Sequence, residues 1–412
     1  MALHIMDEAN RCLGCKKPSC VEGCPIRTPI PEVIRLLKEN RLDEAGWMLF
    51  ENNPLTTVCS LICNHEKQCE GHCVLGKKGA PVHFSTIEQY VSSAYAPKMT
   101  KGPKPSNGMR VAIIGSGPAG ITIAIILARY GYQVTIFENK PEIGGVLRYG
   151  IPEFRLPKSV LDDIKYRHIE MKGIKVRPNT HIGSAIGVDD LFRDGYRAIF
   201  VGTGVWKPNA LHIKGETLGH VHFGINYLNS PDSFKLGKKV IVIGAGNAAM
   251  DVARTAIRHG VEDLTCFSIT KEVAASKYEY SYARLEGTNF EYNKRPVEIV
   301  DEGVIFMDVA EDENGNLTDI AGTERLYPAD SVIVSISQGP QNVIVNTTKG
   351  LDVDGHGLLV ADENGNTTRP GIFASGDVVL GARTVVEAVV HSKKVAESMH
   401  RYMQSLPREE DL

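Results

Sequence analysis

The stretch RVAIIGSGPAGITIAIILARYGYQVTIFE, residues Arg110–Glu138, carries the clearest structural signal in this 412-residue chain. Its apolar run Val111–Ile114 predicts a buried strand, Ala119–Tyr130 a helix, and Val134–Phe137 a second strand. A G-x-G-x-x-G turn joins the first strand to the helix through Gly115, Gly117 and Gly120. The first glycine of such a turn permits the tight bend, the second lets the backbone approach a pyrophosphate, and the third lets the helix pack on the strand.

An acidic residue, Glu138, follows the second predicted strand and can accept hydrogen bonds from the hydroxyl pair of a ribose. The unpaired amides at the start of the helix attract phosphates. A glycine-rich turn with no chemical use is the alternative, but it does not account for strand, turn, helix and acid standing in register. This segment therefore predicts a dinucleotide site.

The same fingerprint recurs in KKVIVIGAGNAAMDVARTAIRHG, residues 238–260, where Gly244, Gly246 and Ala249 follow the predicted strand Val240–Ile243. The chain thus contains two nucleotide-binding units, which implies two different nucleotides. Near the end, residues 370–399 supply a strand, the pair Gly376-Asp377 and a long amphipathic helix. Alone, a Gly-Asp pair after a strand indicates only a turn.

Eight of the nine cysteines stand in two groups before the first fingerprint: Cys12, Cys15, Cys20 and Cys24, then Cys59, Cys63, Cys69 and Cys73, while Cys266 stands alone. The first residues lack the features of a signal peptide, so the cytosol is the expected location and disulfides are disfavoured. The tight run CLGCKKPSCVEGCP, which closes on Cys-Pro, favours iron–sulfur ligation. Zinc held by cysteine pairs is the first alternative and unligated thiols are the second.

Composition sets the remaining bounds. A hydrophobic content of 42% supports two or three globular domains, and no apolar run reaches the roughly 20 residues that cross a bilayer. A net charge of -3 gives no general field for nucleic acid or an acidic membrane. Helical spacing predicts a hairpin with core residues Ile30, Val33, Ile34, Leu37, Leu42, Ala45 and Leu49. The Pro-, Gly- and Lys-rich segment 96–108 reads as a linker.

Together these segments resemble the two-dinucleotide flavoproteins, and PEIGGVLRYGIPEFRLPK (141–158) and VGTG (201–204) match further signatures of that group. Nearly the whole chain resembles the glutamate synthase small-subunit family. That family includes the electron-input part of dihydropyrimidine dehydrogenase and the large subunit of NADH-dependent ferredoxin:NADP oxidoreductase. The segments CEGHCVLGKKGAPV, YGIPEFRLPK, GAGNAAMDVART and ASGDVVLGARTVVEAV carry the resemblance in order along the chain.

The resemblance implies an α/β fold with two Rossmann-like dinucleotide-binding domains, preceded by an α-helical iron–sulfur domain. The helical domain is expected over residues 1–105. The FAD domain is expected from two parts, 106–212 and 341–412. The NAD(P)H domain, 213–340, is inserted between them.

The resemblance also implies the site residues. The first fingerprint binds the ADP half of FAD, the second binds NAD(P)H, and the terminal Gly-Asp segment returns to the ribityl-phosphate side of the flavin. The expected cofactor-binding residues are Gly115, Gly117, Pro118, Ala119, Gly120, Glu138, Gly145, Arg148, Gly202, Thr203, Gly204, Gly244, Gly246, Asn247, Ala248, Ala249, Asp251, Lys271, Gly376, Asp377, Thr384 and Val385.

Two 4Fe-4S clusters are expected in the helical domain. One takes Cys12, Cys15, Cys20 and Cys73. The other takes Cys24, Cys63 and Cys69, with Glu88 as its fourth ligand, Gln89 as the adjacent alternative, and Cys59 left as a spare buried thiol.

In such a protein the flavin must lie between NAD(P)H, which gives up two electrons together, and clusters, which accept one at a time. Positioning then suffices for catalysis, so no acid–base pair is expected. Neither nucleotide domain has a Cys-x-x-Cys pair, which disfavours a disulfide relay. Ile269 and Thr270 stand where NADPH-using relatives place arginines, and although Lys271 could reach a phosphate, the sequence leans to NADH.

Three functions remain open on this basis. The preferred one is an electron-input subunit that serves a larger catalytic partner: a glutamate synthase large subunit, a dihydropyrimidine dehydrogenase subunit or a ferredoxin-coupled flavoprotein. The second is a catalytically silent nucleotide-binding scaffold. The third is a stand-alone diaphorase that reduces small acceptors. Nucleic acid and membrane partners are not expected.

Overall fold

The computed structural model describes residues 4–98 and 102–407, and the contacts of the chain divide it into two compact units. One unit contains the residues up to Leu147, Glu153–Val205 and Pro340–Leu412. The other contains Arg148–Pro152 and Trp206–Gly339. The domain boundaries expected from the sequence stay a prediction, and residues 99–101 of the expected linker lie outside the described part of the chain.

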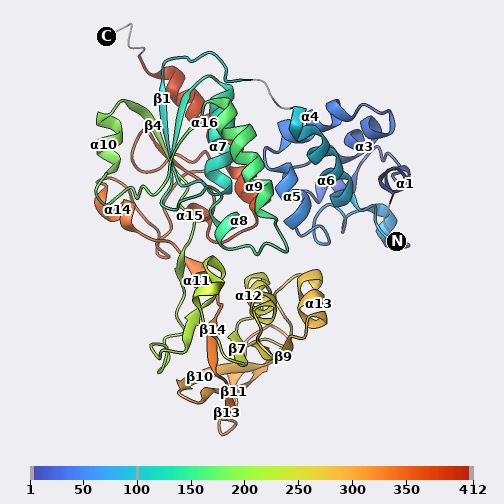
Figure 1. Ribbon diagram of the computed structural model, residues 1–412, viewed down its shortest axis with the longest axis vertical. Coiled ribbons are helices and arrows are strands. Elements are labelled where there is room, and N and C mark those ends of the chain that lie inside the picture. Colours follow the sequence, from blue (N-terminus) through green and yellow to red (C-terminus); the bar gives the residue numbers. More distant parts are fainter. Residues whose placement is uncertain (1–3, 99–101, 408–412) are drawn as a thin grey trace. The chain divides into compact units, whose positions relative to one another are not determined.

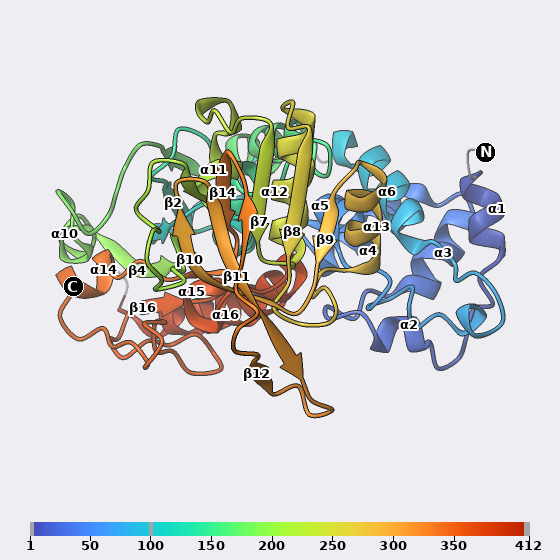
Figure 2. The ribbon, with the colours of Figure 1, turned by 90° about the horizontal axis from the view of Figure 1, so that it is seen from below.

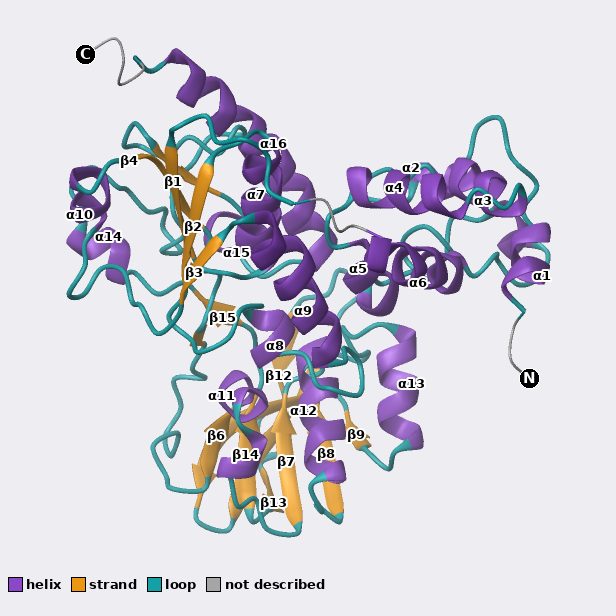
Figure 3. Ribbon diagram, turned by 45° about the horizontal axis from the view of Figure 1, so that its top comes forward, coloured by secondary structure: helices purple, strands orange, loops and turns teal. Residues whose placement is uncertain are grey.

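The region before the first fingerprint consists of helices and loops in its described part (Figure 3). Its helices are α1 (Ile5–Asn10), α2 (Ser19–Glu22), α3 (Ile30–Lys38), α4 (Leu42–Asn52), α5 (Thr56–Ile62) and α6 (Phe84–Tyr95), with 3₁₀ turns η1 (Val74–Lys77) and η2 (Ala96–Lys98). The predicted hairpin is confirmed as α3 and α4. Six of its seven expected core residues are buried, and Leu42 is partly buried.

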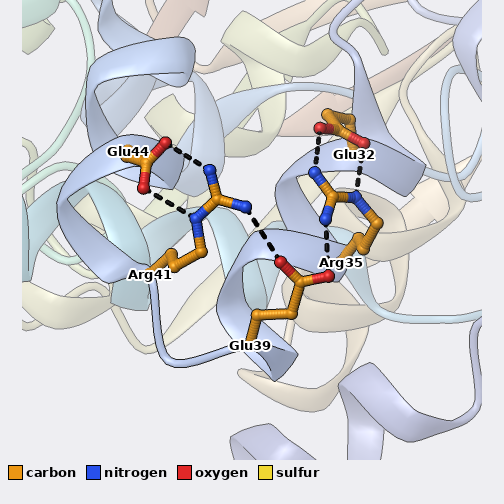
Figure 4. Close-up of polar contacts among 5 residues, drawn as sticks. All are labelled: Glu32, Arg35, Glu39, Arg41 and Glu44. Atoms are coloured by element: carbon orange, nitrogen blue, oxygen red, sulfur yellow. Dashed lines mark hydrogen bonds and ion pairs between the residues drawn. The ribbon is translucent and has the colours of Figure 1, made fainter.

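The turn of this hairpin depends on Asn40, whose φ of 59° lies in the left-handed region that asparagine tolerates. Charged side chains also bridge the turn. Glu39 accepts hydrogen bonds from Arg35 at 2.5 Å and from Arg41 at 3.0 Å, and each arginine also binds a glutamate of its own helix (Figure 4). These side chains are exposed, so the network contributes little stability and mainly orients the two helices.

The first fingerprint lies in a parallel sheet with strand order β16-β4-β1-β2-β3, whose β1 and β4 are marked in Figure 1. The strands are β1 (Arg110–Ile114), β2 (Gln133–Phe137), β3 (Lys175–Arg177), β4 (Tyr196–Val201) and β16 (Ile372–Ala374). The strand and helix predictions of this segment are confirmed to within one residue at each end. Because Ile114 pairs with both Phe137 and Val201, the carboxyl ends of three strands meet at one edge.

Helices cover this sheet. The helix of the fingerprint, α7 (Pro118–Arg129), packs beside the long terminal helix α16 (Val385–Ser405) (Figure 1). The remaining helical segments are α8 (Val146–Tyr149), α9 (Lys158–Ile164), the π turn η3 (Lys165–Ile169), η4 (Glu170–Lys172), α10 (Val188–Arg193), α14 (Val343–Thr347) and α15 (Asp377–Leu380). Most of these are too short to leave a helical period in the sequence.

The second unit repeats the arrangement with strand order β6-β14-β7-β8-β9, again all parallel. Its strands are β6 (Val221–Phe223), β7 (Lys239–Ile243), β8 (Asp263–Phe267), β9 (Asn289–Glu291) and β14 (Ser331–Val334). Its helices are α11 (Gly224–Asn229), η5 (Pro231–Ser233), α12 (Asn247–Arg258) and α13 (Lys277–Leu285). Cys266 lies in the core between these layers, and burial raises the pKa of its thiol.

An antiparallel sheet completes the second unit: β10 (Lys294–Val300), β11 (Gly303–Glu311), β12 (Leu317–Asp319) and β13 (Arg325–Pro328). A short ladder joins β5 (Lys207–Pro208) to β15 (Gln338–Gly339). Residues 308–319 form the β11–β12 hairpin, which extends beyond its sheet in Figure 2. In the described part of the chain, no helix is long and apolar enough to cross a membrane.

Candidate functional site

The first glycine-rich turn lies at the carboxyl edge of β1, and its glycines carry different constraints. Gly115 has a φ of 95°, and a Cβ there would lie 2.6 Å from the carbonyl oxygen of Gly202. A Cβ on Gly120 would lie 2.0 Å from the carbonyl oxygen of Gly115. At Gly117, in contrast, a Cβ would meet no other atom of the described chain within 4 Å. The turn thus leaves open space at the one glycine where a pyrophosphate would approach.

Glu138 stabilises this turn. Its buried carboxylate accepts hydrogen bonds from the backbone N–H of Ser116 at 2.9 Å and from that of Lys140 at 2.8 Å, and it also binds the Ser116 hydroxyl. Two carboxylate oxygens offer about four lone-pair directions, so the capacity to accept a ribose hydroxyl remains. Ser116 was not among the expected site residues, although its place between two glycines of the turn was a usable signal.

Other expected FAD residues surround the turn. A Cβ on Gly115 would lie 3.3 Å from Thr203, one on Gly145 would lie 2.8 Å from Gly117, and one on Gly376 would lie 3.1 Å from Ala119. Pro118 and Ala119 open helix α7, and Gly204 follows Thr203 along the chain. Arg148 lies on α8, but its contacts place it in the other compact unit.

The terminal segment brings its expected residues to two helix starts. Asp377 begins α15, and burial raises the pKa of its carboxyl to about 6. Thr384 caps α16, where its backbone N–H donates to Glu387 at 3.0 Å, and Val385 is the first residue of that helix. Asp377 and Val385 thus stand at helix starts, where first-turn backbone N–H groups have no intrahelical partner and suit the polar and phosphate groups of a dinucleotide.

The second glycine-rich turn repeats the first within the other unit. Gly244 has a φ of 129°, and a Cβ there would lie 2.2 Å from the carbonyl oxygen of Ser335, whereas Gly246 faces open space. Ala249, in the third glycine position, is fully buried. Asn247 accepts a hydrogen bond from the backbone N–H of Ser276 at 2.8 Å. Ala248 and Asp251 lie on the same helix, α12, and Asp251 is buried.

The first set of expected cluster ligands lines one cavity of the helical region. That cavity is bounded by Cys12, Cys15, Cys20 and Cys73, with Cys69 and apolar side chains such as Ile30, Ile34 and Phe84. Burial and the neighbouring Cys73 raise the pKa of Cys20 to about 11. Four soft donors around an apolar cavity fit an iron–sulfur cluster.

The second set surrounds a buried carboxylate. Glu88, on α6, is only 6% exposed and accepts a hydrogen bond from the Thr56 hydroxyl at 2.7 Å. Burial raises the pKa of its carboxyl to about 7. Burial also raises the pKa of Cys69, with Glu88 and Cys24 adding to the effect. Gln89, the alternative ligand, is exposed.

Cys63 belongs to the same set. Its pKa is raised first by a hydrogen bond with Cys59, then by burial and by the nearby charges of Cys59 and Glu88. The spare thiol Cys59 is buried, at 3% exposure, beside Cys63. The structure therefore brings Cys24, Cys63, Cys69 and Glu88 into one neighbourhood, as the interleaved ligand pattern requires.

Two buried polar atoms test whether a cluster fits there. Asn64 Oδ1 and His65 Nε2 have no hydrogen-bond partner among the described residues, and both follow Cys63 directly in the chain. A protonated Nε2 of His65 could donate to a cluster sulfur, whereas Asn64 Oδ1 only accepts and would gain no partner from sulfur. Among the described residues, no three His, Cys, Asp or Glu side chains converge on a single metal ion. A four-iron cluster does not need such convergence, because each iron takes one protein ligand.

The comparison with protein families decides the assignment. Residues 109–396 match the family model described as pyridine nucleotide-disulphide oxidoreductase. The chain belongs to that family. Residues 2–99 match a second model, dihydropyrimidine dehydrogenase domain II, 4Fe-4S cluster. This family member is therefore an oxidoreductase with FAD, NAD(P)H and 4Fe-4S domains, which confirms the predicted fold class and cofactor types.

Two curated relatives match almost the whole of this chain. The glutamate synthase [NADPH] small chain of Escherichia coli (strain K12) is 32% identical over 96% of this chain and 91% of its own length. The NAD-dependent dihydropyrimidine dehydrogenase subunit PreT of Salmonella typhimurium is 30% identical over 98% of this chain and 95% of its own length. The structure of FprA from Mycobacterium tuberculosis in complex with NADPH is 16% identical, covers 73% of this chain and 85% of its own, and has a TM-score of 0.61. That likeness shows the shared fold.

Proposed function

We propose that this oxidoreductase is an electron-input subunit that oxidises NAD(P)H and passes electrons singly to a larger catalytic partner. One observation carries the proposal. Both sets of cysteine ligands and the FAD turn lie in one compact unit of the described structure. Bound FAD supplies the exchange between two-electron and one-electron transfer that neither nicotinamide nor a cluster supplies alone.

The chain's own residues act by positioning. Gly117 and Gly246 admit the pyrophosphates of FAD and NAD(P)H, because both face open space. Glu138 fixes the first turn through Ser116. Cys266 is buried and solitary, and no Cys-x-x-Cys pair stands in either nucleotide domain, so no disulfide relay is proposed. No acid–base pair is proposed either, since hydride transfer needs alignment of the reactants.

The first cluster site is the proposed exit for electrons. Leu13, between ligands Cys12 and Cys15, is 65% exposed, and Gly14 beside it is also exposed. A groove at the surface is lined by these residues. Glu88, at the second site, is buried. A partner that docks over Leu13 therefore approaches the first site most closely.

The partner is proposed to be a glutamate synthase large subunit, because the relatives named glutamate synthase small chain cover nearly the whole chain. A dihydropyrimidine dehydrogenase subunit is the second candidate, favoured by the similarity to PreT. NADH is the proposed donor, since Ile269 and Thr270 offer no guanidinium for a 2′-phosphate. The cytoplasm is the proposed location.

Anaerobic purification from the native cell tests this function. The protein is expected to carry flavin, about eight iron atoms and as many sulfides per chain. NADH is expected to bleach its visible spectrum, and a larger flavoprotein or iron–sulfur protein is expected to copurify. A colourless protein would favour the scaffold alternative. Turnover of a physiological substrate by the isolated chain would favour the diaphorase.

The double variant Cys12→Ser/Cys15→Ser isolates the exit step. It is expected to keep NADH-dependent reduction of the flavin and to lose electron transfer to the partner. Cys59→Ser is the matched control, because Cys59 is a buried cysteine of the same region that no cluster is expected to use. If the double variant still reduces the partner at the normal rate, electrons do not leave through the first site.

A further inference from the structure

The loop after β8 stands where a nucleotide bound by the second unit would place its ribose. In a Rossmann unit the residues that follow the second strand face the 2′ position of the adenosine ribose. Here these residues are Ser268–Glu272. The loop is tied to the glycine-rich turn, because the backbone N–H of Ala275 donates to the carbonyl of Ala245 at 3.0 Å. Loop and turn therefore belong to one site.

Two of the five side chains of this loop, Lys271 and Glu272, are charged, and both are exposed. The hydroxyls of Ser268 and Thr270 lie 3.0 Å apart, and both donate to the carbonyl of Glu272. Ile269 between them is apolar, and Lys271 is exposed. The loop thus lacks the arginine typical of NADP sites, and its one acid, Glu272, is exposed.

An acidic side chain from a strand 40 residues away in the sequence accepts a hydrogen bond from the loop. Glu311, the last residue of β11, accepts a hydrogen bond from the backbone N–H of Lys271 at 2.8 Å through its Oε2. Its second oxygen makes no hydrogen bond with a described residue. The backbone holds this strand in place, because Lys294 donates to the carbonyl of Ser268 at 3.0 Å and Val309 to that of Asn293 at 2.9 Å.

We propose that Glu311 sets the nucleotide preference of the second unit by accepting the 2′-hydroxyl of NADH and repelling the 2′-phosphate of NADPH. A phosphate carries close to two negative charges at neutral pH, so a carboxylate beside it is unfavourable. A free hydroxyl instead finds an ionised acceptor, which makes the stronger kind of hydrogen bond. The inference rests on the proposed function, in which this unit binds NAD(P)H.

The test compares NADH and NADPH as reductants of the flavin in the full holoprotein. Glu311→Gln removes the charge but keeps an oxygen that can accept from Lys271, so the loop is expected to stay in place. It is expected to shift the ratio of kcat/KM for NADPH over NADH by about tenfold toward NADPH. Glu311→Arg is expected to shift it further, since a guanidinium pairs with phosphate.

Glu313→Gln is the matched control, because Glu313 is an exposed acid in the same hairpin turn. It is expected to leave the ratio unchanged. Flavin content and circular dichroism check that each variant is folded. The inference fails if Glu311→Gln keeps the native ratio, or if the native protein prefers NADPH. If the native protein neither binds nor is reduced by either nucleotide, as judged by fluorescence titration and flavin bleaching, the proposed function fails with it.

Discussion

At Gly120 an added methyl carbon would lie 2.0 Å from a backbone oxygen, whereas at Gly117 it would meet open space. The two glycines belong to one motif, yet the fold requires Gly120, whereas the role proposed for Gly117 is to admit the pyrophosphate of FAD. The Gly120 constraint comes from helix α7 packing on β1, and it exists without FAD. A constraint at Gly117 is expected only when a pyrophosphate is bound.

Matched alanine variants separate these roles. Gly120→Ala is expected to destabilise the flavin-free protein by about 1–3 kcal/mol, because backbone must move to relieve the clash. Gly117→Ala is expected to leave that stability unchanged and to lower FAD content. Urea unfolding of the flavin-free protein and flavin absorbance after reconstitution measure the two effects. Full FAD binding by Gly117→Ala would contradict the assignment of the turn.

The buried carboxylate of Glu88 leads to a second prediction at this scale. Glu88→Gln keeps an acceptor for the Thr56 hydroxyl but removes the proposed anionic ligand. Iron and labile sulfide are expected to fall from about eight toward about four per chain, with FAD retained. Gln89→Glu is the control, because this neighbour is exposed. An unchanged cluster content and an unchanged electron paramagnetic resonance spectrum would show that Glu88 is not a ligand.

Among the elements, the α3–α4 hairpin shows how local and distant interactions combine. Its apolar spacing predicted both helices, and the structure confirms them. The turn between them needs a residue with positive φ, and Asn40 supplies it. Since α3 contributes Ile30 and Ile34 to the wall of the first cysteine cavity, the hairpin positions that cavity.

Substitution of Asn40 tests the strain at this turn. Asn40→Ala is expected to lower the free energy of unfolding by about 1 kcal/mol, because alanine tolerates the left-handed region poorly. Asn40→Gly is expected to stay close to the native stability, since glycine adopts this conformation without steric cost. Urea midpoints at equal cofactor content provide the comparison. An equal loss of unfolding free energy in both variants would show that the Asn40 side chain, and not its backbone conformation, accounts for the effect.

At the scale of the whole molecule, side chains join the helical region to the FAD domain within one unit. Phe50 of α4 stacks on His168 of the π turn, with ring centroids 4.9 Å apart. Arg129 of α7 pairs with Glu51 at 2.5 Å, and Lys393 of α16 donates to the carbonyl of Asn52 at 2.5 Å. These contacts fix the thiol-bearing helices against the FAD domain, which an electron path between them requires.

His168 is expected to make this junction sensitive to acid. Burial lowers its pKa from 6.5 to about 4, with the charges of Lys172 and Arg167 adding to the effect and Asp163 opposing it. A folded-state pKa below the unfolded value means that the contribution is complete above pH 6.5 and is lost as pH falls toward 4. The loss amounts to at most about 3 kcal/mol.

His168→Phe keeps the stacking on Phe50 and removes the titrating group. The difference in unfolding free energy between native protein and variant is expected to be constant above pH 6.5 and to shift in favour of the variant below it. Acid release of prosthetic groups affects both proteins and cancels in the difference. His356→Phe, at an exposed histidine, is the control. If the difference in unfolding free energy does not vary with pH, His168 is not the source of the acid sensitivity.

Local patterns in the chain were enough to predict the two nucleotide folds, the helical hairpin and the cysteine groups. Apolar periodicity, glycine spacing and cysteine spacing each report on residues close in sequence, and their physics is local. The short helices α8, α14 and α15 escaped prediction, because an element of four or five residues spans little more than one helical turn.

Other features arise only when distant segments pack together. Glu88 is buried by α5, and its hydrogen-bond partner Thr56 stands 32 residues away. Glu311 lies 40 residues from Lys271, and only the pairing of β10 with β11 brings it to the ribose loop. Nothing in the neighbouring sequence of either acid distinguishes it from a surface carboxylate. Burial and electrostatic surroundings depend on three-dimensional packing. The family resemblance had pointed to Glu88, but only the tertiary structure shows that Glu88 is buried and that Glu311 contacts the loop after β8.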